Sequence, residues 1–251
     1  MKAWLKASLI LGVIGIILCI VAVVCGSSLD LNYLKEKISL DGKREINYDV
    51  ESNNISDLKI KIGAANVKIM EGDSFKIEGK INKVSIVEKN NTLYIEDENK
   101  INIFGKNNNQ IIVYVPNEYE FKNVEMEIGA GQIDIDKINI KNKFDLKIGG
   151  GLAILNNVLC EDAKIECGAG KIEGNISANN IDIECGAGNT ELKLEGSKDE
   201  YNYDLDVGVG RIKVGDVTIN SADKKEMRNT NENRSIKVDC GTGNVNIEFS
   251  K

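Results

Sequence analysis

The sequence predicts an all-β protein: a single-stacked β-solenoid built from coils of about 20 residues, preceded by one N-terminal transmembrane helix. Three observations support this fold class. A 19-residue stretch near the N-terminus carries no charge, the rest of the chain alternates apolar and polar residues, and a glycine-centred pattern of ten positions occurs seven times. We expect an anchor at 1–26, a juxtamembrane segment at 27–50 and the solenoid domain at 51–251.

The predicted anchor is Ala7–Cys25. As a helix with a rise of 1.5 Å per residue it spans roughly 28 Å, close to the ~30 Å hydrocarbon thickness of a bilayer. Lys2 and Lys6 precede it, whereas 26–34 contains no Lys or Arg. The charge bias predicts a single-pass protein of the cell membrane, with a cytoplasmic N-terminus and an extracytoplasmic C-terminal domain.

Two alternatives to an uncleaved anchor stay open. A signal peptide cleaved near the small residues at 25–27 is one, although the apolar run exceeds the usual h-region of 7–15 residues. A lipid-modified Cys25 is the other, although Cys25 follows Val24 where a lipoprotein needs a small residue.

The recurring pattern is apolar, polar, apolar, Gly, any, usually Gly, any, apolar, polar, apolar. Such a pattern predicts a short strand, a corner and a second strand, since the glycines permit a positive φ or a close backbone approach. The predicted turn residues are Gly63, Gly129, Gly131, Gly149, Gly151, Gly168, Gly170, Gly186, Gly188, Gly208, Gly210, Gly241 and Gly243. One coil cannot bury its apolar face alone, but a stack of coils can.

The spacing of the leading glycines is regular only in the middle of the domain. From Gly129 to Gly208 the gaps are 20, 19, 18 and 22 residues, as expected for one coil per repeat. The final gap of 33 contains the polar stretch Ser221–Arg234, which predicts an exposed loop. The first gap of 66 contains two strand-like segments joined by Asn90–Asn91, which predicts a hairpin.

The composition argues against several classes of function. The chain has no His, which removes Ser-His-Asp and Cys-His nucleophile systems and His-ligated zinc sites. A net charge of -7 is atypical of nucleic-acid binders. The glycine motifs lack the third glycine and the following helix of a dinucleotide fingerprint, and no Gly-Lys-Ser or Gly-Lys-Thr occurs. We therefore expect no enzyme activity, no cofactor, no metal, no nucleic acid and no small-molecule substrate.

Three cysteines, Cys167, Cys185 and Cys240, occupy the apolar position before the leading glycine. Other copies place Ile or Val there, so we interpret these cysteines as small core residues. A disulfide between Cys167 and Cys185 on adjacent coils and a metal site are the alternatives.

The polar residue before that position is acidic in most copies. If the coils stack in register, Glu166, Glu184 and Asp206 of successive copies form an acidic ladder with steps of about 5 Å. Like charges at this spacing repel, and a divalent cation or a cationic partner could relieve that repulsion. The alternative is a solvated face whose charge is compensated by neighbouring Lys and Arg residues.

The Gly-Ala-Gly corners, flanked by Ile-Glu-Cys and Lys-Ile-Glu, resemble the bacterial "putative adhesin" family over about 57–249. Its members are membrane-anchored, repeat-rich envelope proteins of unknown function, and some accompany envelope-stress systems of low-GC Gram-positive bacteria. The resemblance implies a non-enzymatic module that binds or scaffolds an envelope protein or polymer. A self-assembling bactofilin-like structural protein and a polysaccharide-active β-helix enzyme are the competing hypotheses.

Overall fold

The computed structural model describes residues 44–52, 54–81, 84–97, 109–229 and 234–250. The chain divides into two compact units, Met1–Gly42 and Lys43–Lys251, and every described residue belongs to the second. The predicted anchor Ala7–Cys25 thus lies outside the described residues. Within the described ranges, none of the helical structure has the length and apolar character needed to span a bilayer.

The second unit is all-β, as predicted, apart from a single 3-10 turn among its described residues, η1 (Lys198–Glu200). The strands are β1 (Arg44–Asp49), β2 (Asp57–Gly72), β3 (Lys76–Ile81), β4 (Val84–Lys89), β5 (Thr92–Asp97), β6 (Gln110–Pro116), β7 (Glu120–Ile135), β8 (Ile138–Leu159), β9 (Asp162–Cys167), β10 (Lys171–Ser177), β11 (Asn180–Cys185), β12 (Asn189–Glu195), β13 (Asn202–Val207), β14 (Arg211–Val214), β15 (Val217–Asn220), β16 (Asp223–Met227), β17 (Ser235–Cys240) and β18 (Asn244–Ser250).

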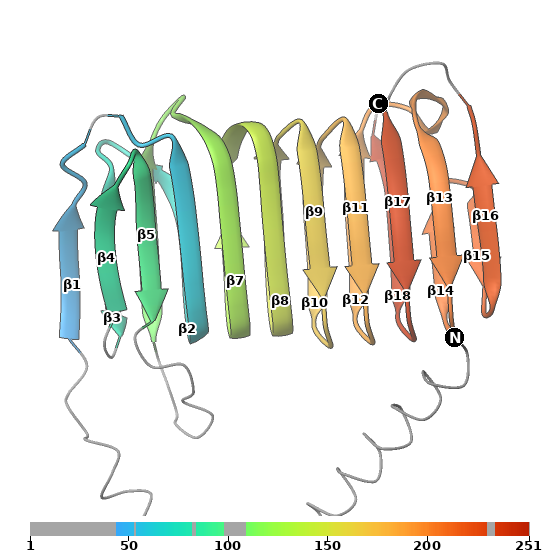
Figure 1. Ribbon diagram of the computed structural model, residues 1–251, viewed down its shortest axis with the longest axis horizontal. Coiled ribbons are helices and arrows are strands. Elements are labelled where there is room, and N and C mark those ends of the chain that lie inside the picture. The colour runs from blue at the N-terminus through green and yellow to red at the C-terminus, as the bar shows by residue number, and fades with distance from the viewer. Residues whose placement is uncertain (1–43, 53, 82–83, 98–108, 230–233, 251) are drawn as a thin grey trace, which may run out of the picture. The chain divides into compact units, whose positions relative to one another are not determined.

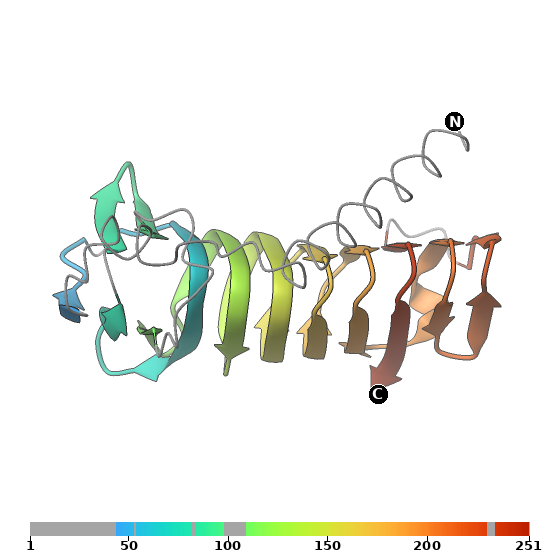
Figure 2. The ribbon, with the colours of Figure 1, turned by 90° about the horizontal axis from the view of Figure 1, so that it is seen from below.

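The strands form two layers, because each coil runs along one layer, turns at its glycine corner and returns along the other (Figures 1 and 2). The spatial order in the first layer is β4, β5, β2, β7, β8, β9, β11, β17, β13 and β16. In the second layer it is β1, β3, β6, β2, β7, β8, β10, β12, β18, β14 and β15. Strands β2, β7 and β8 continue through the corner and belong to both layers.

The alternation of apolar and polar residues places the core between the layers. In β9, for example, Ala163, Ile165 and Cys167 are buried, whereas Lys164 and Glu166 point outward. In-register parallel pairing repeats this arrangement from coil to coil, so that each position of the pattern forms a column along the stack. The solenoid-like architecture follows from this repetition.

The leading glycines are required because successive corners are in close contact. A Cβ added to Gly149 would lie 2.6 Å from the carbonyl oxygen of Gly129, and one added to Gly168 would lie 2.5 Å from that of Gly149. The second glycine has a further constraint in several corners, as at Gly151, where φ is +138°. Both reasons for glycine that the sequence suggested therefore apply.

The order of the coils differs from the order of the sequence near the C-terminus. The coil formed by β17 and β18, which we call the C-terminal coil, lies between the β11–β12 coil and the β13–β14 coil (Figure 1). The coils therefore do not all stack in the order of the sequence.

Charge pairing favours this order at one register position, although the same coil places Asp239 beside Glu184 and Asp206. Sequential stacking would place Asp204 directly beside Asp182, and like charges at register positions are destabilising. The C-terminal coil instead inserts Lys237, which is the register partner of both aspartates. Its Nζ lies 3.7 Å from Oδ1 of Asp182.

Both ends of the parallel stack carry antiparallel strands. At one end β4 pairs with β5 and β1 with β3, and at the other β16 pairs with β13 and β15 with β14. The β4–β5 hairpin confirms the predicted one, with positive φ at Asn90 and Asn91. The exposed loop predicted over Ser221–Arg234 needs correction, because Asp223–Met227 forms the edge strand β16.

The corner geometry makes a direct prediction for two adjacent glycines. Gly151→Ala should lower the free energy of unfolding by at least about 2 kcal/mol, because an alanine there adopts an unfavourable φ. Its Cβ would also lie 2.0 Å from the carbonyl oxygen of Gly131. Urea denaturation followed by circular dichroism measures this loss.

The matched control is Gly150→Ala, since a Cβ at Gly150 meets no atom within 4 Å. The free energy of unfolding of this variant should lie within about 0.5 kcal/mol of that of the parent. Equal losses in the two variants would contradict the close stacking of the corners.

Candidate functional site

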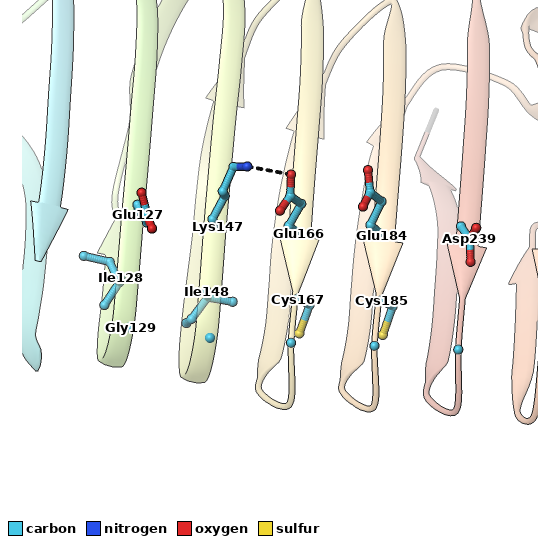
Figure 3. A pocket seen from close by; sticks show the side chains of 14 residues that line it. Glu127, Ile128, Gly129, Lys147, Ile148, Glu166, Cys167, Glu184, Cys185 and Asp239 are labelled. Atoms are coloured by element: carbon cyan, nitrogen blue, oxygen red, sulfur yellow. Dashed lines mark ion pairs between the residues drawn. The ribbon is translucent and has the colours of Figure 1, made fainter. Parts of the chain in front are cut away.

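The glycine corners leave a groove along the first layer that has backbone in place of side chains (Figure 3). We call it the glycine groove; it encloses about 610 Å³. Its base follows Gly129, Gly149, Gly168, Gly186 and Gly241, and one side is formed by the outward column Glu127, Lys147, Glu166, Glu184 and Asp239. The groove crosses five coils and is therefore a continuous, elongated surface.

The column alternates in charge at one end of the groove and is acidic at the other. Lys147 lies 2.8 Å from Glu166, and Lys164 bridges Glu166 at 2.9 Å and Glu184 at 3.1 Å. Hydrogen bonds from the two lysines lower the pKa of Glu166, so this carboxylate is charged and compensated. The compensated face considered as an alternative is thus present at Glu166.

The acidic run continues in an order that the sequence analysis did not predict. Asp239 is the register partner of both Glu184 and Asp206, so the row is Glu184, Asp239, Asp206. Among the described residues neither Asp239 nor Asp206 has an ion-pair partner within 4.0 Å, although Lys224 is the register partner of Asp206. The ammonium of Lys224 lies instead 3.6 Å from Asp204.

The predicted ladder Glu166, Glu184, Asp206 is therefore corrected by the insertion of Asp239. Asp239 occupies the same outward position in the last copy of the pattern. That it lies between Glu184 and Asp206 follows only from the order of the coils. Two features of the sequence could have indicated that the last coil stacks out of order: the gap of 33 residues before it and the positive charge of Lys237. We call Glu184, Asp239 and Asp206 the acidic run.

The three cysteines beneath the groove form a row on consecutive coils, because Cys185 is the register partner of both Cys167 and Cys240. All four described cysteines are buried free thiols, so the structure contains no Cys167–Cys185 disulfide. Burial raises the pKa of Cys240 to about 11 and that of Cys160 to about 12. Cys240 and Cys160 are packed as core residues, and protonation keeps these two thiols weak nucleophiles.

Neither the groove nor its surroundings contains an arrangement typical of a metal centre. Within the described ranges no group of three or more His, Cys, Asp or Glu side chains is placed to hold a metal ion. A second groove, of about 670 Å³, lies on the other layer, lined by amides such as Asn157 and Asn175 and by Lys193. It lacks a run of like charges.

The fold and its glycine groove define a solenoid-like, all-β protein with an extended surface. The chain belongs to the Toastrack DUF4097 family, whose model matches residues 55–251. This membership agrees with the resemblance to the "putative adhesin" proteins found in the sequence.

Solved structures similar to this chain come from several bacteria. A "putative cell adhesion protein" from Clostridium sporogenes is 13% identical, with a TM-score of 0.45, covering 83% of this chain and 100% of its own. A "putative adhesin" from Bacteroides fragilis is 14% identical, with a TM-score of 0.37 and coverage of 82% and 98%. One from Parabacteroides distasonis is 15% identical, with a TM-score of 0.35 and the same coverage. A comparison with curated proteins finds no match.

The buried Cys240 thiol predicts a loss of stability at alkaline pH. The unfolded Cys240 thiol ionises near pH 8.5–9, whereas the folded one stays protonated until about pH 11. The contribution of the protonated Cys240 thiol to the free energy of unfolding is fully present below about pH 8.5. It is lost as the pH rises toward about 11, at about 1.4 kcal/mol per pH unit. Urea denaturation at pH 8 and pH 10 measures the loss.

Cys240→Val should reduce this alkaline loss by about 1.4 kcal/mol between pH 9 and pH 10. Valine fits the position, because Val207 occupies it in the adjacent coil. Ile236→Val, a change in the same coil without a titrating group, should leave the pH dependence unchanged. Identical slopes for the parent and Cys240→Val would contradict the assignment.

Proposed function

We propose that this chain is a non-enzymatic cell-envelope protein that displays its solenoid outside the membrane as a binding or scaffolding module. The partner-binding surface is the glycine groove together with the acidic run, and the partner is a cationic envelope protein or polymer. The observation that carries the proposal is the pair Asp239 and Asp206, two adjacent carboxylates for which the described residues provide no ion pair. The family resemblance extends the proposal to a role in envelope-stress response.

Electrostatics supports a cationic partner. Strands that pair in a sheet lie about 4.8 Å apart, so the acidic run brings three carboxylates together at this spacing. Directly opposed like charges destabilise a sheet, and a bound cation relieves that repulsion. A partner that supplies amines at similar intervals gains one contact for each coil.

The shape of the groove supports an extended partner. Its base is backbone, so a chain lying along the stack approaches the coils without displacing side chains. The row of corner glycines gives the same surface at every step. An extended peptide or polymer fits such a repeating surface better than a compact ligand does.

The structure provides less support for the two competing hypotheses. End-to-end assembly needs parallel, uncapped terminal coils, whereas antiparallel strands occupy both ends and the edge strand β16 carries Lys224 and Lys225. A glycan hydrolase needs a carboxyl group whose pKa is raised to act as general acid. The pKa of Glu166 is lowered by its lysines.

The acidic run should bind a lysine-rich probe such as a ten-residue oligolysine. Replacing its three carboxylates together (Glu184→Gln, Asp239→Asn, Asp206→Asn) should weaken binding about tenfold, since three exposed charge contacts of about 0.5 kcal/mol are lost. Isothermal titration calorimetry at low and at high salt measures the affinity. Salt should weaken binding to the parent more than to the variant.

The control neutralises three exposed carboxylates elsewhere, Glu120→Gln, Glu161→Gln and Glu195→Gln, and so changes the net charge equally. It should retain nearly the parent affinity. Equal weakening in both triple variants would show that only net charge matters and would refute the proposed surface.

The proposed orientation places the whole solenoid outside the cell. Protease added to intact cells should therefore remove an epitope tag fused after Lys251, whereas a tag before Met1 should survive until the cells are lysed. Immunoblotting detects both tags. Survival of the C-terminal tag on intact cells, with digestion after lysis, would contradict an extracytoplasmic domain.

A further inference from the structure

The C-terminal coil occupies a position that the preceding chain leaves open. We call the space between the β11–β12 coil and the β13–β14 coil the slot. Strand β17 pairs in parallel over six positions with β11 on one side and over six with β13 on the other. Strand β18 pairs over seven positions with β12 and over four with β14. The last described residues of the chain thus join two coils that precede them in sequence.

The slot cannot remain empty in a stable fold. The C-terminal coil contributes apolar side chains that are at most 1% exposed, namely Ile236, Val238, Cys240, Val245 and Ile247. Without them, the two facing coils expose apolar surface and the unpaired edges of four strands, β11, β12, β13 and β14. Such edges are templates for pairing with another chain.

A crossover at 196–201, which includes η1, contacts both ends of the C-terminal coil. At its start, Arg234 forms an ion pair with Glu200, and its guanidinium lies 4.4 Å from the ring centroid of Tyr201. At its end, the rings of Tyr201 and Phe249 are 5.9 Å apart, and Gly196 donates a backbone hydrogen bond of 2.9 Å to Ser250. The C-terminal coil is therefore held by contacts with the crossover at 196–201 as well as by its pairing with the two facing coils.

We propose that the slot accepts the C-terminal coil of a second copy of this chain, so that two copies exchange these coils and form a strand-swapped dimer. The walls of the slot specify the occupant by register and charge. Lys237 lies 3.7 Å from Asp182, and β17 pairs in register with both β11 and β13. A second copy supplies the same residues with the same spacing, and exchange of an identical element is a low-cost route to a dimer.

The exchange conserves the contacts of the slot, because each coil binds equivalent partners in either arrangement. The equilibrium between monomer and swapped dimer is therefore set by protein concentration and by the connection that precedes the coil. We expect the dimer fraction to rise with concentration during refolding.

The test uses two full-length chains, each with one new exposed thiol at a position of the slot. One carries Asn189→Cys on β12 and the other Asn244→Cys on β18, which are register partners. Both carry Cys19→Ser and Cys25→Ser, while the described native thiols are buried. The chains are unfolded together, refolded at increasing concentration and treated with a short bismaleimide, whose two maleimide groups each add one thiol.

The expected result is a covalent dimer of one chain of each kind, at least fivefold more abundant in the co-refolded mixture than in a mixture of separately refolded chains. A single chain carrying both substitutions should cross-link within itself, which shows that the two positions meet. Two copies of the Asn189→Cys chain should give no covalent dimer above the level of the separately refolded chains.

Covalent monomer alone at every concentration, with complete internal cross-linking of the doubly substituted chain, would overturn the proposal. Arg234→Ala adds a second measurement. It removes the ion pair at the crossover from monomer and dimer alike, so exchange under native conditions should become several-fold faster at an unchanged final dimer fraction. If Arg234→Ala changed the final dimer fraction and left the rate of exchange unchanged, that result would also contradict the proposal.

Discussion

The close contact between successive glycine corners is the constraint on which the rest of this structure depends. A Cβ on the leading glycine of one coil would lie 2.5–2.8 Å from the carbonyl oxygen of its neighbour, so only glycine allows the coils to stack at strand spacing. Stacking at that spacing fixes the register, because a shift by one residue would move the apolar side chains to the outside. The core, the outward columns and the glycine groove all follow from this register.

The register also makes side chains far apart in the sequence into neighbours, and these neighbours determine the local chemistry. Lys164 reaches carboxylates on its own coil and on the next, which stabilises the column at Glu166 and Glu184. Below the groove, the same register brings Cys167, Cys185 and Cys240 together in the core. The in-register stacking of the coils thus determines which side chains are neighbours both on the surface and in the core.

The sequence was sufficient for the features that depend on a single coil. Alternation predicted the strands, recurrence predicted the solenoid-like stack, and the Asn90–Asn91 pair predicted the hairpin. The order of the coils could not be predicted in the same way, because every copy of the pattern presents nearly the same edge to its neighbours. Only the outward charges distinguish the copies, and Lys237 between Asp182 and Asp204 becomes informative once the pairing is known.

This dependence on coil order also explains why the candidate site was only partly predicted. Glu166, Glu184 and Asp206 were recognised by their place in the pattern, but the inserted coil adds Asp239 and separates two members of the expected ladder. Along the column, lysines compensate the carboxylates near Glu127 and Glu166, whereas the acidic run lies toward the end of the stack opposite β1 (Figure 1). The coil that enters out of sequence order thus supplies Asp239, which lies beside Asp206 and makes with it the pair of carboxylates for which the described residues provide no ion pair.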